Sequence, residues 1–212
     1  MFYEASKRFI DIVGSILLLI LFSPVILIAS ILIRLTSKGP VLADIPKRVG
    51  KNGKLFRLLK FRSMILNAHD LMKKDPKFRK LYEEYKKTNY KLYNDPRITP
   101  IGKFIRKYSI DEIPQFVNVL NGEMSIVGPR AYFPDELVEQ QEKYPKTKKW
   151  VKEALTVKPG ITGYWQVTGR SEINFDKRIE MDAFYARKRS VLFDVLVLLK
   201  TPWAMISGKG AY

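Results

Sequence analysis

The sequence predicts a mostly helical α+β protein that carries one small β-hairpin or sheet and an N-terminal hydrophobic segment. Three observations predict this fold class. Residues 12–33 contain no charged side chain, Asn52-Gly53 is a strong turn signal, and most later segments place apolar residues at helical spacing. We therefore divide the chain into a hydrophobic segment, residues 1–38, and one globular domain, residues 39–212.

The uncharged run of residues 12–33 is long enough to enter a bilayer, since a helix rises about 1.5 Å per residue and a hydrocarbon core is about 30 Å thick. Ser23 and Pro24 lie near its centre, where proline removes a backbone hydrogen bond. Two topologies remain open: a kinked spanning helix, or a re-entrant helix-break-helix hairpin within one leaflet. Basic residues on both flanks favour the hairpin slightly, because they prefer the cytoplasmic side. These residues are Lys7, Arg8, Arg34 and Lys38.

The elements of the domain follow in order. Asn52-Gly53 predicts a β-hairpin within residues 41–64, and residues 157–170, rich in glycine and aromatic side chains, predict a loop and a strand. Pro114 suits the first position of a helix that ends at Asn121-Gly122. The predicted helices cover residues 67–91, 101–107, 114–121, 134–144, 147–155, 174–189 and 191–206.

The last predicted helix, residues 191–206, is apolar but interrupted by Asp194, Lys200 and Pro202. Its length and these interruptions argue against a second membrane span. Two interpretations remain equal: an amphipathic helix in the membrane interface with Trp203 as an anchor, or a buried core helix.

Composition narrows the function classes. Lys and Arg number 38 against 21 acidic residues, which gives a net charge of +17 and predicts an anionic partner: nucleic acid, an anionic membrane or a phosphorylated substrate. The absence of cysteine excludes disulfides and thiolate metal sites. A single histidine, His69, excludes metal cages of several histidines, and we expect it on the surface of the polar helix.

Asp111 and Glu112 are adjacent acids in this basic chain. A structural explanation exists, because Ser109 and Glu112 match a capping box and the acids precede a helix. A chemical one exists as well: carboxylates with basic side chains suit a site where Mg²⁺ and phosphate oxygens meet, and a carboxylate can itself attack phosphorus. The basic candidates are Lys60, Arg62, Arg130 and Arg170.

Four stretches occur together and in order: "KRVGKNGKLFRLLKFRSM", "NDPRITPIGKFIRKYSIDEIPQFVNVLNGEMSIVGPR", "VKPGITGYWQVTGR" and "MDAFYARKRSVLFDVLVLLKT". With them, nearly the whole chain resembles the bacterial sugar transferase family, the monotopic phosphoglycosyl transferases. The resemblance implies transfer of a sugar-1-phosphate from a nucleoside diphosphate sugar to polyprenyl phosphate, with release of the nucleoside monophosphate.

The resemblance also implies roles for individual residues. Asp111 matches the nucleophile that forms a covalent phosphosugar intermediate, and Glu112 matches its partner, which helps to bind Mg²⁺ or deprotonates the acceptor. Ser23-Pro24 matches the break of a re-entrant hairpin, which moves our prediction to the one-leaflet topology. The remaining positions in family motifs, which we expect to bind phosphate or substrate, are Lys60, Arg62, Arg130, Gln166, Arg170, Asp182 and Asp194.

One departure from the family pattern is Ala131, where many members have the second proline of a Pro-Arg-Pro sequence. This departure concerns the geometry of the loop, because Arg130 itself is kept. The polar insertion at residues 65–95 and the ending "KGAY" favour galactose or glucose as the sugar, with an N-acetylhexosamine as the alternative. The expected partners are a UDP-sugar, undecaprenyl phosphate and the lipids of one leaflet at the cytoplasmic face of the bacterial inner membrane; a homo-oligomer is left open.

Three rival functions follow from the same features. A nucleic-acid-binding protein would explain the charge, but it leaves residues 12–33 unexplained and no nucleic-acid-binding module is evident, so we expect no nucleic acid partner. A membrane-anchored scaffold would explain the hydrophobic run but not the acids among basic residues. A glycosyl transferase that moves sugar without phosphate would release UDP rather than UMP.

Overall fold

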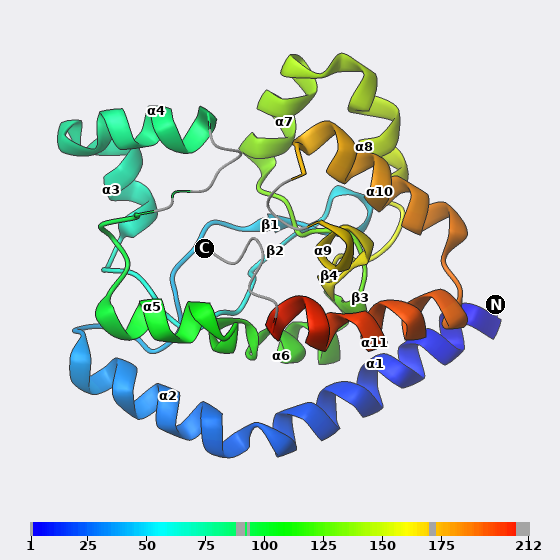
Figure 1. The fold of residues 1–212 in the computed structure, drawn as a ribbon, viewed down its shortest axis with the longest axis horizontal. Helices are drawn as coiled ribbons and strands as arrows, with labels where there is room; N and C mark the ends of the chain where they lie inside the picture. Colours follow the sequence, from blue (N-terminus) through cyan, green and yellow to red (C-terminus); the bar gives the residue numbers. More distant parts are fainter. Residues whose placement is uncertain (1, 88–91, 93, 170–172, 207–212) are drawn as a thin grey trace.

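The structure, a computed structural model, describes residues 2–87, 92, 94–169 and 173–206 and is mainly helical, with two small two-stranded sheets. Helices α1 (Phe2–Leu21) and α2 (Ser23–Thr36) form a bent pair along one edge, and the rest of the described chain stacks on it (Figure 1). The predicted α+β class with a dominance of helix is confirmed.

The bend between α1 and α2 is 61° and lies at the predicted Ser23-Pro24 break. Pro24 has no N–H to donate to the carbonyl of Ile20, and the hydroxyl of Ser23 donates to that carbonyl instead, at 2.8 Å. Among the described residues, none of the helices could cross a membrane by itself, by length and hydropathy, but this bent pair could. The break is thus confirmed, whereas its re-entry within one leaflet stays a prediction.

Polar side chains fix α1 to the domain. The buried carboxylate of Asp11 accepts hydrogen bonds from Ser125 Oγ and Ile126 N, both at 2.9 Å. Arg8 donates to the carbonyls of Val119 and Leu120, at 2.6 and 2.8 Å. A shift of α1 along the domain would leave these buried polar groups without partners. The hydrogen bonds therefore hold the helix in one register against the domain.

The predicted hairpin is confirmed as strands β1 (Arg48–Val49) and β2 (Leu55–Phe56), which pair antiparallel. Its turn places Asn52 at φ 55° and Gly53 at φ 79°, a left-handed conformation that Asn and Gly adopt at low cost. A second sheet was not predicted: β3 (Ser125–Val127) pairs parallel with β4 (Gly160–Thr162). A Cβ on Gly160 would lie 2.0 Å from the nitrogen of Gly128, so this pairing requires glycine.

The prediction of one helix over residues 67–91 is wrong. The structure has two helices there, α3 (Ala68–Lys74) and α4 (Arg79–Lys87), because Pro76 cannot continue a helix and keeps Asp75 extended. A short helix α9 (Tyr164–Thr168) also lies within the predicted loop and strand. The other predicted helices are confirmed as α5 (Pro100–Lys107), α6 (Gln115–Leu120), α7 (Pro134–Lys143), α8 (Lys148–Ala154), α10 (Phe175–Lys188) and α11 (Val191–Ile206).

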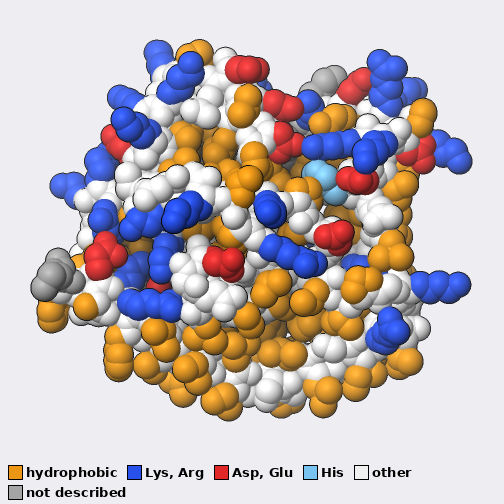
Figure 2. All heavy atoms as spheres, turned by 180° about the vertical axis from the view of Figure 1, so that it is seen from behind, with side chains coloured by type: hydrophobic (Ala, Val, Ile, Leu, Met, Phe, Trp, Pro, Cys, Tyr) orange, Lys and Arg blue, Asp and Glu red, His pale blue; other side chains and the backbone are white. Residues whose placement is uncertain are grey.

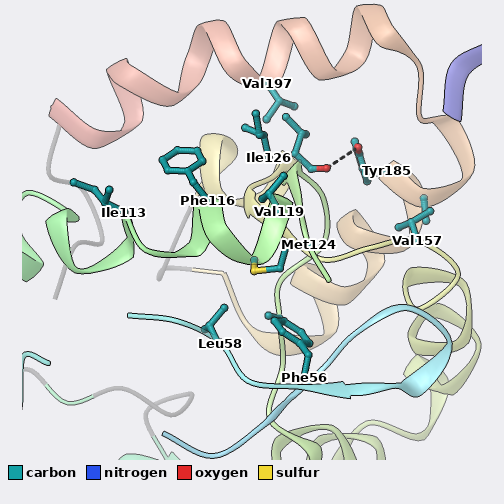
Figure 3. Packing of buried hydrophobic residues seen from close by; sticks show 13 residues of the cluster. Phe56, Leu58, Ile113, Phe116, Val119, Met124, Ile126, Val157, Tyr185 and Val197 are labelled. Atoms are coloured by element: carbon teal, nitrogen blue, oxygen red, sulfur yellow. Dashed lines mark hydrogen bonds between the residues drawn. The ribbon is translucent and has the colours of Figure 1, made fainter. Parts of the chain in front are cut away.

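The main core lies between α6, α11, β3 and the chain from β2 to Leu58 (Figure 3). There Tyr185 donates to the carbonyl of Val127 at 3.1 Å, while Phe116 and Val197 pack nearby. Helix α11 therefore carries apolar side chains both on the side that faces the core and on the side that faces outward. Val197 is buried in the core, whereas Leu199 and Trp203 are 72% and 75% exposed.

The exposed face of α11 is part of a larger apolar surface. Exposed hydrophobic side chains also cover α1 and α2, and Figure 2 shows them gathered along the lower edge of the molecule, while Lys and Arg spread above. An apolar surface of this extent is typical of an interaction site.

Candidate active site

The acid pair lies on a 3₁₀ turn, Ile110–Glu112, between α5 and α6. Ser109 precedes it at φ 54° and its side chain makes no capping hydrogen bond, so the capping-box interpretation is wrong. Asp111 is 7% exposed and Glu112 is half-buried. The turn therefore presents two carboxylates from a buried position, without a capping role for Glu112.

Lys60 joins the two carboxylates. Its Nζ lies 2.6 Å from Glu112 Oε1 and 3.4 Å from Asp111 Oδ2. The backbone brings the two segments together, since Phe61 N donates to the carbonyl of Asp111 at 2.9 Å. The structure thus unites Lys60, Asp111 and Glu112, as the sequence predicts.

The electrostatics of the two acids differ. Burial raises the pKa of Asp111, although the charge of Lys60 acts in the opposite direction. Burial alone would also raise the pKa of Glu112, but the charge and hydrogen bond of Lys60 outweigh it, so that pKa lies below its usual range. A buried carboxylate beside an ammonium group is a poorly solvated anion, which suits a nucleophile.

The acids open onto a cavity with a volume of about 1060 Å³. Its polar wall includes Lys60, Arg130 and Gln166, and its apolar wall includes Phe22 at the bend of α1 and α2 and Pro202 of α11. A cavity of this size accommodates a large ligand, and its two walls suit a molecule with a polar and an apolar part.

Arg130 follows β3 and lines the cavity through a loop that Asp182 of α10 holds. Asp182 Oδ2 accepts hydrogen bonds from Arg130 N at 3.2 Å and from the Tyr132 hydroxyl at 2.9 Å. The Arg130 guanidinium lies 5.8 Å from the ring of Trp165. Burial raises the pKa of Asp182 to about 7. Asp182 does not line the cavity, so its contacts position Arg130 from behind.

Two other predicted site residues, Gln166 and Arg62, border the cavity but differ in what their side chains contact. Gln166 lines the cavity; its Nε2 donates to the Ile161 carbonyl at 3.3 Å, and its Oε1 has no partner in the described part of the chain. Arg62 borders the same cavity, but its guanidinium donates to the carbonyls of Ser37 and Lys38, at 2.9 and 2.7 Å, and so ties down the chain after α2. Arg170 lies outside the described residues.

Asp194 is not brought to the acid pair. It is buried between α11 and α1, where it accepts hydrogen bonds from Tyr3 at 3.1 Å, Lys7 at 2.9 Å and Tyr185 at 2.6 Å. It does not line the cavity. The structure therefore gives Asp194 a place in holding α1 against α11.

Sequence reasoning missed many residues of the cavity wall, among them Arg48, His69 and Trp165. The expectation that His69 lies on the surface holds in part, because His69 is half-buried on α3 and its ring stacks on Phe133 with ring centroids 5.6 Å apart. Arg48 lies four residues before Asn52 in the predicted hairpin, and this position is the local signal that the sequence offers for it. Their grouping depends on contacts between distant segments.

Asp111 and Glu112 could hold Mg²⁺ only together with further ligands from outside the protein. Within the described ranges, no cluster of three or more His, Cys, Asp or Glu could hold a metal. Mg²⁺ is commonly bound by one or two carboxylates together with substrate phosphates and water. Asp111 and Glu112 therefore suffice as protein ligands only where a phosphate substrate completes the shell.

Comparisons with known proteins show the family to which the chain is similar. The family of bacterial sugar transferases matches residues 2–208. The chain is 41% identical to an undecaprenyl-phosphate galactose phosphotransferase of Salmonella typhimurium over 97% of this chain and 41% of the relative. It is 38% identical to the exopolysaccharide production protein ExoY of Sinorhizobium fredii, over 98% of this chain and 88% of the relative.

A third relative is a UDP-glucose:undecaprenyl-phosphate glucose-1-phosphate transferase of Escherichia coli, 38% identical over 97% of this chain and 41% of the relative. The chain thus spans about two fifths of the length of the Salmonella and Escherichia relatives. Because the family match covers nearly all of the chain and the relatives are 38–41% identical to it, the protein belongs to the bacterial sugar transferase family.

Proposed function

We propose that this protein transfers a hexose-1-phosphate from a UDP-sugar to undecaprenyl phosphate and releases UMP. The observation that carries the proposal is the contact of Lys60 with both Asp111 and Glu112 in a cavity that also has an apolar wall. Family membership and the names of the relatives support the reaction class. The transfer would be the first membrane step in assembling a polysaccharide.

The reaction runs in two steps through Asp111, as a ping-pong mechanism. First, an Asp111 carboxylate oxygen attacks the phosphorus that carries the sugar, and the bond from that phosphorus to the bridging oxygen breaks. UMP leaves with the bridging oxygen and its electron pair. Next, an oxygen of the lipid phosphate attacks the same phosphorus, and the Asp111 carboxylate is released. Glu112 accepts the proton when the acceptor arrives protonated.

Lys60 and Arg130 hold the phosphate charge while these bonds change. Mg²⁺ bound by Asp111 and Glu112 would neutralise charge on the phosphate oxygens. Lys60 already holds Glu112 at 2.6 Å, so the acid pair is oriented before substrate binds.

The bent helices provide the membrane side of the proposal. A re-entrant α1–α2 pair in the cytoplasmic leaflet of the inner membrane would place the cavity at headgroup level, where the acceptor phosphate lies. Phe22 at the bend and Pro202 of α11 line the cavity, and α1, α2 and α11 carry exposed apolar side chains, which supports entry of a lipid chain from that side. The sugar is galactose or glucose, as in two of the relatives' names, with N-acetylhexosamine as the alternative.

The test uses purified protein in lipid nanodiscs with Mg²⁺, undecaprenyl phosphate and a panel of UDP-galactose, UDP-glucose and UDP-N-acetylhexosamines. We expect UMP release with one donor and a phosphohexose adduct on the intact protein when the acceptor is left out. Asp111→Asn abolishes both, because an amide oxygen is a far weaker nucleophile. The control Asp70→Asn changes an exposed acid paired with Lys74 and leaves turnover intact.

Two results contradict the proposal. Full activity in Asp111→Asn would remove the covalent step, and release of UDP would replace phosphosugar transfer with sugar transfer.

A further inference from the structure

Arg48 is a buried cation on the wall of the cavity that has no role in the steps above. It lies on β1 and is 9% exposed. Its Nη1 donates to the carbonyl of Ala131 at 3.1 Å, and the guanidinium lies 3.2 Å from the ring centroid of Phe133. Its Nε has no hydrogen-bond partner among the described residues. A buried guanidinium with unused donors is costly unless a ligand or water completes it.

The surroundings of Arg48 carry an excess of positive charge. Arg130 lines the same cavity and directly precedes Ala131, whose carbonyl Arg48 contacts. Its Nε also has no hydrogen-bond partner among the described residues. Glu136 of α7 is fully buried, but neither of its carboxylate oxygens makes a hydrogen bond to a described residue. Burial, and then the like charge of Arg130, lower the pKa of Arg48, whereas the Glu136 carboxylate acts against them. Two guanidinium groups facing one carboxylate favour an anion between them.

We propose that Arg48, together with Arg130, binds the phosphate of the donor that leaves with the nucleoside. This assignment rests on the proposed function, in which the phosphate that carries the sugar lies at Asp111. The two phosphates of a UDP-sugar are directly linked, so a second cationic position is needed beside Lys60. Arg48 and Arg130 supply planar donors that match phosphate oxygens.

The position of Arg48 favours the donor over the lipid as the source of this phosphate. Figure 1 shows strand β1 near the middle of the molecule, away from α1 and α2 along the lower edge. A lipid phosphate enters from the α1–α2 side, so it reaches Asp111 from the opposite direction. A cation at Arg48 therefore stabilises the negative charge that develops on the bridging oxygen when UMP departs.

The test measures UMP binding by calorimetry to the full chain in nanodiscs, followed by steady-state kinetics with the active UDP-hexose. Arg48→Gln lowers UMP affinity about 10-fold or more, the loss expected for a charge-assisted hydrogen bond. Arg48→Lys, which keeps the charge but loses the planar fork, gives an intermediate loss. The control Arg57→Gln removes an exposed arginine beside β2 and leaves UMP affinity within about twofold. The KM for undecaprenyl phosphate is unchanged in all three.

Two outcomes overturn the assignment. Unchanged UMP affinity in Arg48→Gln or, should that variant not fold, in Arg48→Lys removes the phosphate contact. A raised KM for undecaprenyl phosphate with unchanged UMP affinity assigns the contact to the lipid instead. Failure of the proposed function looks different, because the unmodified protein would then release no UMP from any donor.

Discussion

A buried acid can serve a site without touching the substrate, and Asp182 is the example here. Its Oδ2 holds both Arg130 N and the Tyr132 hydroxyl, while its Oδ1 is buried without a partner among the described residues. The sequence placed Asp182 among substrate-binding candidates, since an acid in a motif gives no sign of which way it faces. Its contacts make it a positioning residue for the loop that carries Arg130.

This position predicts a pH effect on stability. The pKa of Asp182 is raised from 3.8 to about 7 by burial, so the folded state holds this proton more tightly than the unfolded state. The contribution of Asp182 to stability is therefore full below about pH 4, falls by on the order of 1 kcal/mol per pH unit as pH rises to about 7, and is lost above that range. Thermal unfolding of Asp182→Asn lacks this slope, whereas Asp176→Asn, on the same helix, keeps it.

The same residue predicts a split in activity. Asp182→Ala removes the acceptor for Arg130 N and lowers kcat/KM, and Asp182→Asn restores part of it because its amide oxygen still accepts a hydrogen bond. Equal activity in the alanine and asparagine variants would show that the acceptor does not position the loop.

At the scale of elements, the bend between α1 and α2 depends on two adjacent residues. Pro24 lacks the N–H that would reach the Ile20 carbonyl, and Ser23 Oγ satisfies that carbonyl at 2.8 Å. The contacts of Asp11 and Arg8 fix α1 against β3 and α6. The bend therefore has a local cause, and its direction has a tertiary one.

Replacing the proline tests the topology. Pro24→Ala restores the N–H and lets α1 and α2 approach one continuous helix, long enough to span a bilayer. Because the chain has no cysteine, Ala5→Cys and Lys38→Cys can each be labelled in vesicles by a reagent that does not cross membranes. In variants that keep Pro24, we expect both cysteines to react with reagent from the same side of the membrane. Adding Pro24→Ala places part of the Ala5→Cys molecules with this cysteine on the opposite side. Labelling from opposite sides in the Pro24 background would establish a spanning helix.

At the scale of the whole molecule, charge and apolar surface are separated. The net charge of +17 comes with exposed apolar side chains on α1, α2 and α11. Figure 2 shows apolar side chains along the lower edge of the molecule, with most of the Lys and Arg above them. In the membrane position that we propose, basic side chains would draw the protein toward anionic lipid, and the inserted apolar surface would supply contact that salt does not weaken.

This separation predicts how the protein leaves a membrane. A wash in about 1 M salt, where charges are screened within about 3 Å, leaves the protein in the membrane fraction, whereas detergent releases it. Leu199→Ser with Trp203→Ser on α11 weakens retention without changing the net charge. Release of the unmodified chain by salt alone would mean that the apolar surface is covered by something other than lipid.

The sequence by itself determined features whose causes are local. Pro24 predicts the bend, Asn52-Gly53 the turn, and apolar periodicity most helices, since each depends on backbone chemistry within a few residues. Pro76 carries the same kind of local signal for the break between α3 and α4, which the apolar periodicity of residues 67–91 does not show. The acid pair was also evident from sequence, because the types and adjacency of Asp111 and Glu112 are visible there.

Only the tertiary structure decided which side chains meet. Lys60 reaches the acids through a backbone bond between segments 50 residues apart, from Phe61 to Asp111, while Asp194 instead meets Lys7 on α1. Arg62 is occupied by the chain after α2, and Arg48 faces the cavity. An ionisable side chain takes whatever partner packing brings within about 3 Å, and that partner is set by how elements stack rather than by the neighbouring sequence.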